Sequence, residues 1–330
     1  MTASSIHAQT DARRHAMLLT AFTAPVRDAL LADDVIEILA NADGSLWIER
    51  AGIGLTRSDV SLDAASRERV IRLVASSVGE TCDRASPILS AELPGAGERF
   101  EGILPPVSEG PCFAIRKPSA VVLGLDDYVD DGTLTPAVCF ALREAVANRL
   151  NIVVAGGTSS GKTTFTNALL AEPAFSSERV VILEDTRELR CSAEDSVSLR
   201  TWKEGKSLRD LVRSTMRLRP DRILVGEVRG PEALDLLKAW NTGHPGGITT
   251  LHANSALGAL ERLEQLVAEA SPRPAEGLIA QGVDVVVFMA REGGVRRVTE
   301  TLRVSGFDRD GYAVSPLAAP HLSIISQGDT

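Results

Sequence analysis

The stretch that decides the fold is Gly156-Gly157-Thr158-Ser159-Ser160-Gly161-Lys162-Thr163. It matches the phosphate-binding pattern G-x-x-x-x-G-K-[ST] in full. The pattern also has the context that it requires, with an apolar run at residues 151–155 before it and a predicted helix at 163–171 after it. Glycines allow a tight turn, in which consecutive backbone N–H groups and the positive end of the helix face the β- and γ-phosphates. The sequence therefore predicts a P-loop.

Two side chains of this turn have specific tasks in phosphate binding. Lys162 supplies a mobile positive charge to the phosphates, and the Thr163 hydroxyl is placed to ligate Mg²⁺. We therefore expect the cofactors to be ATP and Mg²⁺, and Lys162 to take part in catalysis. The candidate nucleotide-binding residues of the turn are Gly156, Gly157, Thr158, Ser159, Ser160, Gly161, Lys162, Thr163 and Thr164.

Composition limits the class of protein. The 330 residues exceed the usual size of one domain, so two packed units are expected. A hydrophobic share of 44% with 24% charged residues is typical of a folded enzyme. The net charge of -9 disfavours a broad grip on nucleic acid, and 4% aromatic residues disfavour a base-stacking surface. Direct nucleic-acid binding is therefore not expected to be strong, although a local basic groove stays possible.

Cysteine and apolar patterns favour a reduced protein without a membrane span. The cysteines, Cys82, Cys112, Cys139 and Cys191, form no C-x-x-C pair, so neither a zinc site nor a disulfide framework is suggested. No apolar run approaches the roughly 20 residues that a spanning helix needs, which predicts a soluble or peripheral protein. Residues 16–31 have charges interspersed among apolar residues, which favours an amphipathic helix over a cleaved export signal.

The organisation changes along the chain. Residues 1–118 are predicted to form a smaller mixed α+β domain, with strands at 35–40, 45–49, 87–93, 99–104 and 112–117 and a helix at 63–78. Residues 119–135 are acidic and irregular, which indicates an interdomain linker. Residues 136–330 alternate helices with apolar strands at 151–155, 180–183, 223–225, 248–251 and 283–289. Such runs are typical of a parallel sheet covered on both faces, so this part is expected to be a RecA-like α/β P-loop domain.

Hydrolysis also needs a group that orients water, and two acidic strand ends qualify. Glu227 follows the apolar strand at 223–225 and is the candidate for water activation. Glu184 and Asp185 close the strand after the P-loop helix, where they are expected to reach the attacking water or, for Asp185, Mg²⁺. A solvated strand end is the alternative interpretation for each of them.

Two histidines lie near these segments. His252 follows the strand at 248–251, and its place beside the other strand ends favours a role as a sensor of the γ-phosphate. His244 lies in the turn Gly243-His244-Pro245-Gly246-Gly247, and its role stays open. A structural histidine is the alternative for both.

Four segments together resemble the motifs of the type II/IV secretion ATPases. The P-loop resembles their Walker A motif and EDTREL (184–189) their Asp box. The run RPDRILVGEVRGPEALDLLKAWNTGHPGG (219–247) resembles Walker B, and TTLHANS (249–255) the His box. The likeness extends through RFEGILPPV (99–107) and FAIRKPS (113–119), covers most of residues 30–305, and points to the conjugal-transfer branch.

This resemblance implies a homohexameric ring, peripheral at the inner face of the cytoplasmic membrane, that couples ATP hydrolysis to channel or pilus assembly and to transport. Its partners would be inner-membrane secretion-channel subunits. It also implies that Arg99 and Arg116 reach the nucleotide, with a surface salt bridge as the alternative for each. Ser159 stands where the family usually has glycine, which reduces backbone freedom there. The strand before Glu227 ends without an Asp, as is usual for this family, so Mg²⁺ would depend on Thr163, water and the Asp box.

Three hypotheses follow for the function. The secretion-channel motor is favoured by the four motifs together. A nucleic-acid translocase or a pilus-retraction-type motor of the same superfamily is the second possibility, and the missing tetracysteine zinc module fits either the conjugation branch or a retraction motor. A non-hydrolytic, nucleotide-gated scaffold is the third possibility, and Glu227 is the residue that discriminates it from the others.

Overall fold

The computed structural model describes residues 18–20, 22–94, 97–118, 123–201, 205–293 and 295–318. The chain divides into two compact units, residues 1–120 and 121–330. Each unit has its own hydrophobic core and is described by itself. The helix expected over residues 16–31 is interrupted, because residues 18–20 are helical, the backbone of Thr23 is extended, and α2 spans Ala24–Leu31; residues 16, 17 and 21 lie outside the described residues.

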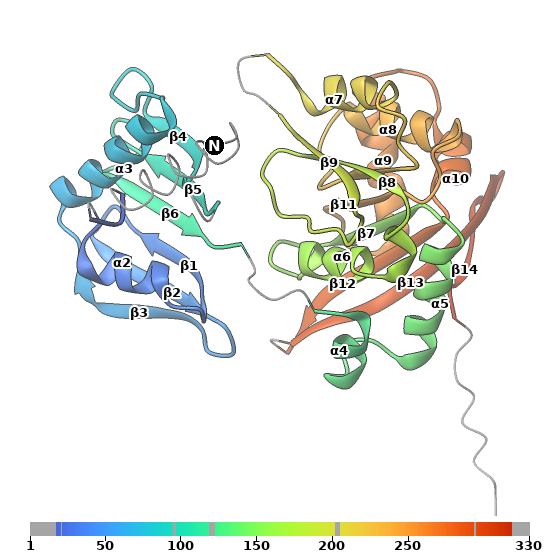
Figure 1. Ribbon diagram of the computed structural model, residues 1–330, viewed down its shortest axis with the longest axis horizontal. Coiled ribbons are helices and arrows are strands. Elements are labelled where there is room, and N and C mark those ends of the chain that lie inside the picture. Colours follow the sequence, from blue (N-terminus) through green and yellow to red (C-terminus); the bar gives the residue numbers. More distant parts are fainter. Residues whose placement is uncertain are drawn as a thin grey trace, which may run out of the picture. The chain divides into compact units, whose positions relative to one another are not determined.

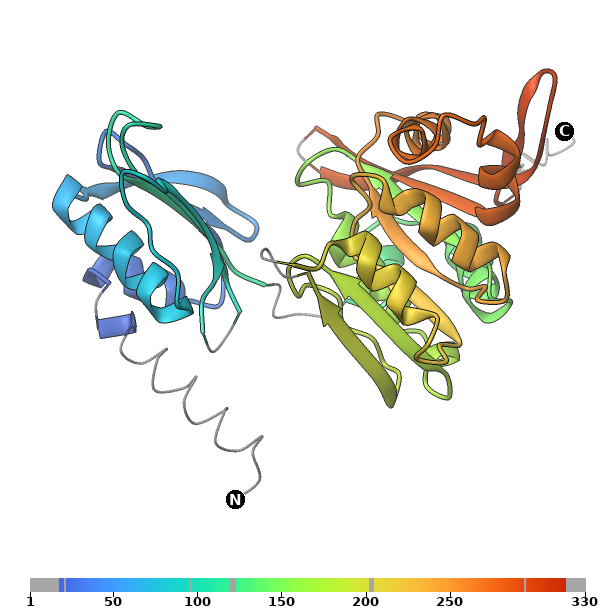
Figure 2. The same cartoon turned by 90° about the horizontal axis from the view of Figure 1, so that it is seen from above.

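The first unit is a six-stranded sheet with helices packed on it. Its strand order is β3-β2-β1-β6-β5-β4, and every neighbouring pair is antiparallel. The helix α3 (Ala64–Val78) lies along the sheet in Figure 2; it begins where the Asp63 carboxylate accepts a hydrogen bond from Ser66 N, and it ends at Gly79. The strands are β1 (Val35–Ala40), β2 (Ser45–Arg50), β3 (Gly54–Ser61), β4 (Ile88–Glu92), β5 (Arg99–Ile103) and β6 (Cys112–Arg116).

The strand β3 was not predicted. Its side chains are mostly exposed, so the alternation of apolar and polar residues that identifies a half-buried strand is missing. It lies at the edge of the sheet and pairs only with β2. Because an edge strand needs backbone pairing more than side-chain burial, its sequence carries little signal.

The second unit is an eight-stranded sheet of order β14-β13-β12-β7-β11-β10-β8-β9 (Figure 1). The six strands from β12 to β9 are parallel to their neighbours, and β13 and β14 form an antiparallel extension. The strands are β7 (Ile152–Gly156), β8 (Arg179–Glu184), β9 (Asp195–Arg200), β10 (Arg222–Val225), β11 (Ile248–Leu251), β12 (Val285–Glu292), β13 (Val295–Asp308) and β14 (Gly311–Pro316).

Helices cover both faces of this sheet. One buried core contains residues of α4, α5 and α6, and the other contains residues of α7, α8, α9 and α10. The helices are α4 (Leu125–Asp130), α5 (Pro136–Ala147), α6 (Lys162–Leu170), α7 (Leu208–Thr215), α8 (Glu232–Asn241), α9 (Ala256–Ala268) and α10 (Glu276–Gly282), with a 3₁₀ turn at Pro173–Phe175. Burial on both faces explains the apolar runs of β7 and of residues 223–225 in β10, whereas β11 buries Thr249 and Thr250 in the same layer.

The structure corrects two details of the expected organisation. The sheet is mixed rather than wholly parallel, because β13 and β14 add an antiparallel edge. The interval 119–135 is also not irregular throughout, since it contains α4. Leu125 is fully buried, and the Tyr128 ring meets Phe165 edge-on at a centroid distance of 5.2 Å, so α4 belongs to the core of the second unit.

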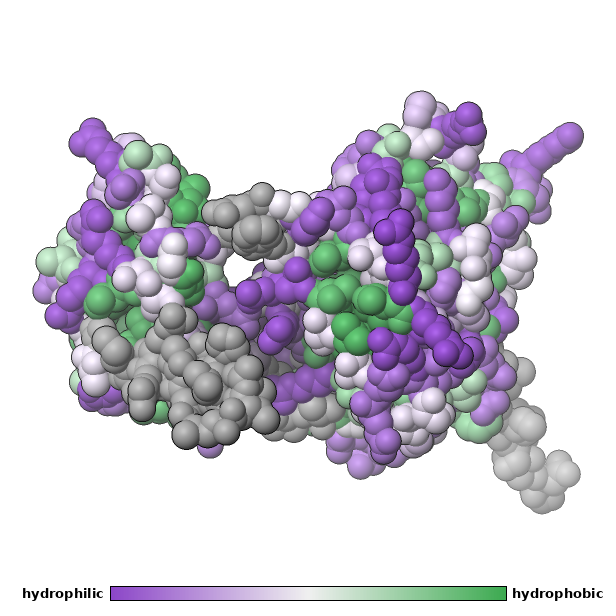
Figure 3. All heavy atoms as spheres, turned by 45° about the horizontal axis from the view of Figure 1, so that its top comes forward, coloured by the Kyte–Doolittle hydropathy of each residue, from purple (hydrophilic) through white to green (hydrophobic). Residues whose placement is uncertain are grey.

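Hydrophilic side chains predominate on the face of the second unit drawn in Figure 3, with a group of apolar side chains among them. Within the part of the chain that the structure describes, no helix combines the length and the apolar character that crossing a bilayer demands. The four cysteines are free thiols, of which Cys82 and Cys139 are buried and Cys112 and Cys191 partly buried, and burial raises the pKa of Cys82, Cys139 and Cys191.

Candidate nucleotide site

The predicted motifs lie together at the carboxyl edge of the parallel strands. The P-loop follows β7, His252 follows β11, Glu227 follows β10 and Glu184 ends β8. In the sheet these strands are neighbours in the order β7-β11-β10-β8. Because parallel strands end at one edge, segments that are far apart in sequence come together beside the phosphate-binding turn.

The backbone of the P-loop is shaped for an anion. Gly161 has a φ of +96° and Ser159 a φ of +58°, both in the left-handed region that turns successive N–H groups toward one concavity. Position 156 cannot hold a side chain, because a Cβ on Gly156 would lie 2.4 Å from Met289 O and 2.7 Å from Ser160 Oγ. The close approach of β12 to this turn therefore requires glycine.

Two polar groups of the turn fit a phosphate ligand. Lys162 is 7% exposed, and its ammonium donates hydrogen bonds to Gly156 O (2.9 Å) and Gly157 O (2.8 Å). The Ser160 hydroxyl is buried, and the described residues supply it with no hydrogen-bond partner. Phosphate oxygens would provide hydrogen-bond acceptors for the unpaired Ser160 hydroxyl and for the Lys162 ammonium, which here binds carbonyl groups of its own loop. The turn therefore fits the triphosphate of ATP.

Glu227 lies between an imidazole and a guanidinium. Its Oε2 accepts hydrogen bonds from Arg229 Nε (2.7 Å) and from Arg229 Nη2. Its Oε1 lies 2.9 Å from His252 Nε2, although this pair is not aligned as a hydrogen bond. The acid is half-buried, whereas Arg229 and His252 are exposed. A carboxylate held at a strand end beside a P-loop is placed to orient a water molecule.

Partial burial of the ring and the charges around it together favour the neutral form of His252. Burial lowers its pKa most, the positive charges of Lys162 and Arg229 lower it further, and Glu227 opposes them. A neutral imidazole has one N–H donor, so His252 can donate to a phosphate oxygen or to the Glu227 carboxylate, but not to both at once.

Glu184 is 4% exposed and supports its own loop. Its Oε1 accepts hydrogen bonds from Glu188 N and Leu189 N, both at 2.8 Å. Burial raises its pKa to about 7, and the two amide hydrogen bonds only partly oppose this. Glu184 therefore fixes the segment 184–189, and its expected contact with the attacking water stays a prediction.

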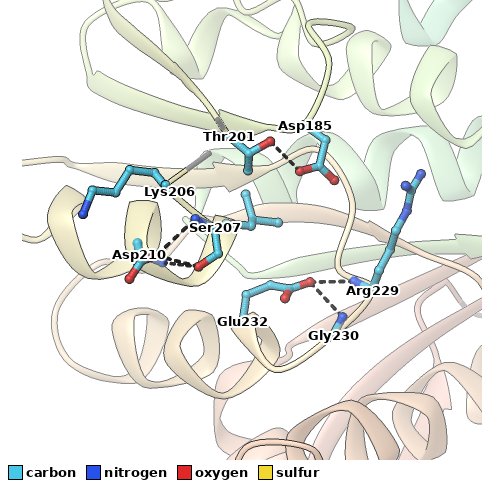
Figure 4. Close-up of a pocket in the computed structure, with 10 residues that line it drawn as sticks. Asp185, Thr201, Lys206, Ser207, Asp210, Arg229, Gly230 and Glu232 are labelled. Carbon is cyan, nitrogen blue, oxygen red and sulfur yellow. Dashed lines mark hydrogen bonds between the residues drawn. The ribbon is translucent and has the colours of Figure 1, made fainter. Parts of the chain in front are cut away.

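Asp185 lines a cavity of about 680 Å³. Its Oδ1 accepts a hydrogen bond from Thr201 Oγ1 at 2.9 Å. Figure 4 shows Asp185 and Arg229 at one end of this cavity and Lys206 and Asp210 at the other. The Arg229 side chain thus connects the cavity with Glu227, because it lines the former and binds the latter. Sequence reasoning assigned no role to Arg229, although it lies only two residues after Glu227.

A divalent cation would not be held by protein groups alone. Across the described ranges, no cluster of three or more His, Cys, Asp or Glu side chains is arranged to ligate a metal ion. Mg²⁺ commonly keeps several waters and binds through one or two protein oxygens with substrate phosphates. Thr163, in the first turn of α6, suits this mode. Asp185 as a second ligand stays a prediction.

His244 lies at the opposite edge of the sheet. It precedes β11, whereas His252 follows it. The turn that contains His244 is fixed by Asn151, whose Oδ1 accepts hydrogen bonds from Gly246 N (2.9 Å) and Gly247 N (3.0 Å). Its glycines and Asn151 thus organise the amino ends of β7 and β11. The structure separates His244 from the phosphate turn.

Arg99 and Arg116 lie directly opposite each other on β5 and β6 of the first unit. Each also has an acid opposite it on its other side, since Glu92 pairs with Arg99 and Glu37 with Arg116. Burial raises the pKa of Glu37 and the Arg116 charge opposes this, so the two side chains interact electrostatically. Contact of these arginines with a nucleotide stays a prediction.

Known proteins resemble this chain over most of its length. "Conjugal transfer protein TrbB" of Rhizobium radiobacter is 48% identical over 309 residues, which cover 92% of this chain and 95% of that protein. "Type IV secretion system protein VirB11" of Bartonella henselae is 31% identical over 322 residues, covering 84% and 90%.

Solved structures have the same fold. The Legionella pneumophila ATPase DotB aligns with a TM-score of 0.58 and 19% identity, covering 84% of this chain and 78% of that one. The pilus retraction motor PilT with bound ADP aligns with a TM-score of 0.58 and 18% identity, covering 88% and 80%. At such identities the likeness concerns the fold alone. The "Type II/IV secretion system protein" family matches residues 25–295. This match spans both units and every motif of the site, and the chain belongs to the type II/IV secretion system protein family.

Proposed function

We propose that this chain is the ATP-hydrolysing motor of a conjugal transfer apparatus of the type IV secretion class. One observation carries the proposal. The P-loop, His252 and Glu227 follow three adjacent strands, and Glu227 Oε1 lies 2.9 Å from His252 Nε2. Support for the biological setting comes from the 48% identity to conjugal transfer proteins of Rhizobium radiobacter and Sinorhizobium fredii.

Hydrolysis begins when the triphosphate enters the turn. Phosphate oxygens take the place of Gly156 O and Gly157 O as partners of the Lys162 ammonium, and the inward N–H groups bind the remaining charge. Mg²⁺, when bound, offsets negative charge on the phosphates as the terminal bond breaks. The protein supplies Thr163 for it, and Asp185 as a further candidate.

Glu227 orients the attacking water and takes its proton as the new bond to the γ-phosphorus forms, and ADP and phosphate then leave. Arg229 binds only Oε2 of this carboxylate, and Oε1 has no hydrogen-bond partner among the described residues, so Oε1 is the oxygen that can accept the water. His252 stays neutral beside Glu227 and contacts the γ-phosphate. Glu184 either reaches this water or acts only through the loop that it fixes.

We further propose a homohexamer at the inner face of the cytoplasmic membrane, in contact with inner-membrane secretion-channel subunits. Supporting this are the family and the relatives named for type IV secretion. Arg99 and Arg116 would contact bound nucleotide, because adjacent arginines attract phosphate more strongly than either one alone. Their pairing on β5 and β6 supports this role.

A complementation experiment tests the motor function. A conjugative system from which this chain's gene has been deleted is supplied with the wild type, Lys162→Ala, Glu227→Gln or the control Lys238→Ala, whose lysine is exposed on α8. We expect DNA transfer with the wild type and the control, and loss of transfer with the other two at equal protein levels. Transfer at the wild-type frequency by Lys162→Ala would refute the motor.

A nucleic-acid translocase is the alternative that this experiment does not separate, because both functions need hydrolysis. A titration of purified protein with DNA at low and high salt does so. We expect weak binding and no stimulation of ATP turnover, because the net charge of -9 repels phosphate. Tight binding with a steep salt dependence and DNA-stimulated turnover would favour the translocase.

A further inference from the structure

The hairpin formed by β12 and β13 flanks the P-loop on the side away from Glu227. Met289 of β12 lies opposite Gly156 of β7 in the parallel register, so β12 continues past the point where β7 turns into the P-loop. Arg291 then lies directly opposite Arg296 of β13. The end of this hairpin is thus next to the phosphate-binding turn, and none of the motifs described above accounts for its arginines.

Arg296 lies against the P-loop itself. A Cβ on Gly161 would be 3.1 Å from Arg296 Cδ and 3.9 Å from its Nε, with Met289 Cε at 3.6 Å. The backbone of Arg296 is anchored, because its carbonyl accepts a hydrogen bond from Thr133 Oγ1 (3.3 Å) and Val298 N donates to Thr133 O (3.1 Å). The side chain is exposed, and within the described ranges no hydrogen bond or ion pair holds its guanidinium.

The charges of the hairpin favour an anion at this place. Arg291 and Arg296 are directly opposite in an antiparallel pair, so both side chains are on one face of the sheet. Met289 shares this face, because it is two residues before Arg291, and it lies beside Gly161. The face of the hairpin that contains Arg296 is therefore the one next to the P-loop.

We propose that Arg296 is a nucleotide-binding residue, which donates hydrogen bonds to the phosphate chain from the hairpin side of the P-loop. The inference rests on the proposed nucleotide site and adds a second cation to Lys162. A guanidinium suits this task, because its five donors in a fixed fork match phosphate oxygens. The short distance from Arg296 to Gly161 gives it direct access to the turn.

Arg297 offers a matched control on the next residue. It lies opposite Ala290, and therefore on the other face of the hairpin from Arg296. Its Nη1 donates a hydrogen bond to Gly132 O at 3.2 Å. Removing either arginine changes the net charge equally, so only a specific contact with nucleotide distinguishes the two variants.

The test is calorimetric titration of the purified full chain with ADP. We expect Arg296→Ala to weaken ADP binding about tenfold or more, as loss of a charge-assisted hydrogen bond implies. Arg296→Lys should lose less affinity than Arg296→Ala, because it keeps the charge but loses the fork of donors. Arg297→Ala should bind ADP as the wild type does. Arg296→Leu separates phosphate contact from base packing: it should lose affinity in the first case and keep it in the second.

Three results would overturn the inference. The first is wild-type affinity in Arg296→Ala, and the second is equal losses in Arg296→Ala and Arg297→Ala. The third is retained affinity in Arg296→Leu, which would indicate packing against the base in place of phosphate contact. Lys162→Ala is titrated in parallel. If it still binds ADP tightly, the P-loop is not the nucleotide site and the proposed function fails. If Lys162→Ala loses binding and Arg296→Ala does not, only the role of Arg296 is lost.

Discussion

His252 Nε2 lies 2.9 Å from Glu227 Oε1, at the carboxyl ends of two neighbouring parallel strands. The pKa of His252 is lowered by burial and by the Lys162 charge, and is raised by Glu227. Because Lys162 and Glu227 shift this pKa in opposite directions, the pKa of His252 depends on the charges of both residues.

The pKa of His252 should therefore move in opposite directions in two variants. Lys162→Ala should raise it, because a positive neighbour is lost, and Glu227→Gln should lower it, because a negative one is lost. The measurement is an NMR pH titration of the imidazole in nucleotide-free protein, assigned with His252→Gln. Shifts in the same direction in both variants would show that these charges do not act on His252.

Glu184 should make the protein less stable at high pH. Its folded-state pKa of about 7 lies above its usual value of 4.5, so the folded protein holds this proton more tightly than the unfolded chain. This contribution is complete below pH 4.5 and is lost as the pH rises through 7. In Glu184→Gln, the amide oxygen can still accept both backbone hydrogen bonds, and no charge forms.

Urea denaturation at pH 5.5 and pH 8 checks this expectation. Glu184→Gln should raise the free energy of unfolding by about 1–3 kcal/mol at pH 8 and by less at pH 5.5. Glu194→Gln, on an exposed residue, should change neither value. Destabilisation of Glu184→Gln at pH 8 would mean that the carboxylate charge itself holds the loop. ATP turnover of the same variant tests whether Glu184 also touches the water.

Ser159 is held in the left-handed region, with a φ of +58°, in the phosphate-binding turn. Ser159→Gly should raise the free energy of unfolding by about 0.5 kcal/mol, since relief of this strain exceeds the extra entropy of the unfolded chain. Ser159→Val should lower it by more than about 1 kcal/mol, because β-branched residues tolerate this conformation poorly. Thermal denaturation measures both, and a valine variant as stable as wild type would contradict the strain.

Gly247 should tolerate no side chain. A Cβ there would lie 1.9 Å from Trp240 Nε1 and 2.7 Å from Ile223 O, and Trp240 Nε1 donates a hydrogen bond to Ile223 O. Gly247→Ala should therefore cost about 3 kcal/mol of stability or more. The control is Gly277→Ala in α10, where no atom lies within 4 Å and the helix should gain about 0.5–1 kcal/mol. Equal stability of the two variants by urea denaturation would contradict the packing.

The position of the P-loop, Glu227 and His252 at one edge of the sheet could be predicted from the sequence, for a physical reason. β7 and most of β10 are apolar, β11 is buried although it contains Thr249 and Thr250, and parallel strands must end at one edge. The position of Glu227 and His252 directly after two of these strands therefore predicts that they lie close together. The P-loop pattern is local to one turn, where Gly161 has a φ of +96°, although Gly156 is also required by the approach of Met289 from β12.

The remaining features depend on long-range contacts. β3 and much of β13 are exposed, so their pairing leaves no periodic apolar signal. Arg296 approaches Gly161 only because β12 pairs with β7, which no local pattern shows. The bond from Arg229 to Glu227 has a local origin and could have been proposed from their spacing, but an arginine near an acid on a loop is too common to single out.

The central claim is that the P-loop holds ATP and that Glu227 activates the water that cleaves it. The most direct measurement is a single-turnover assay of phosphate release from Mg²⁺-ATP, with ATP binding measured on the same samples. Wild type and Glu227→Gln should bind ATP equally. The variant should release phosphate at about one hundredth of the wild-type rate, or more slowly still. Wild-type release by Glu227→Gln, or failure of the wild-type protein to bind ATP, would contradict the claim.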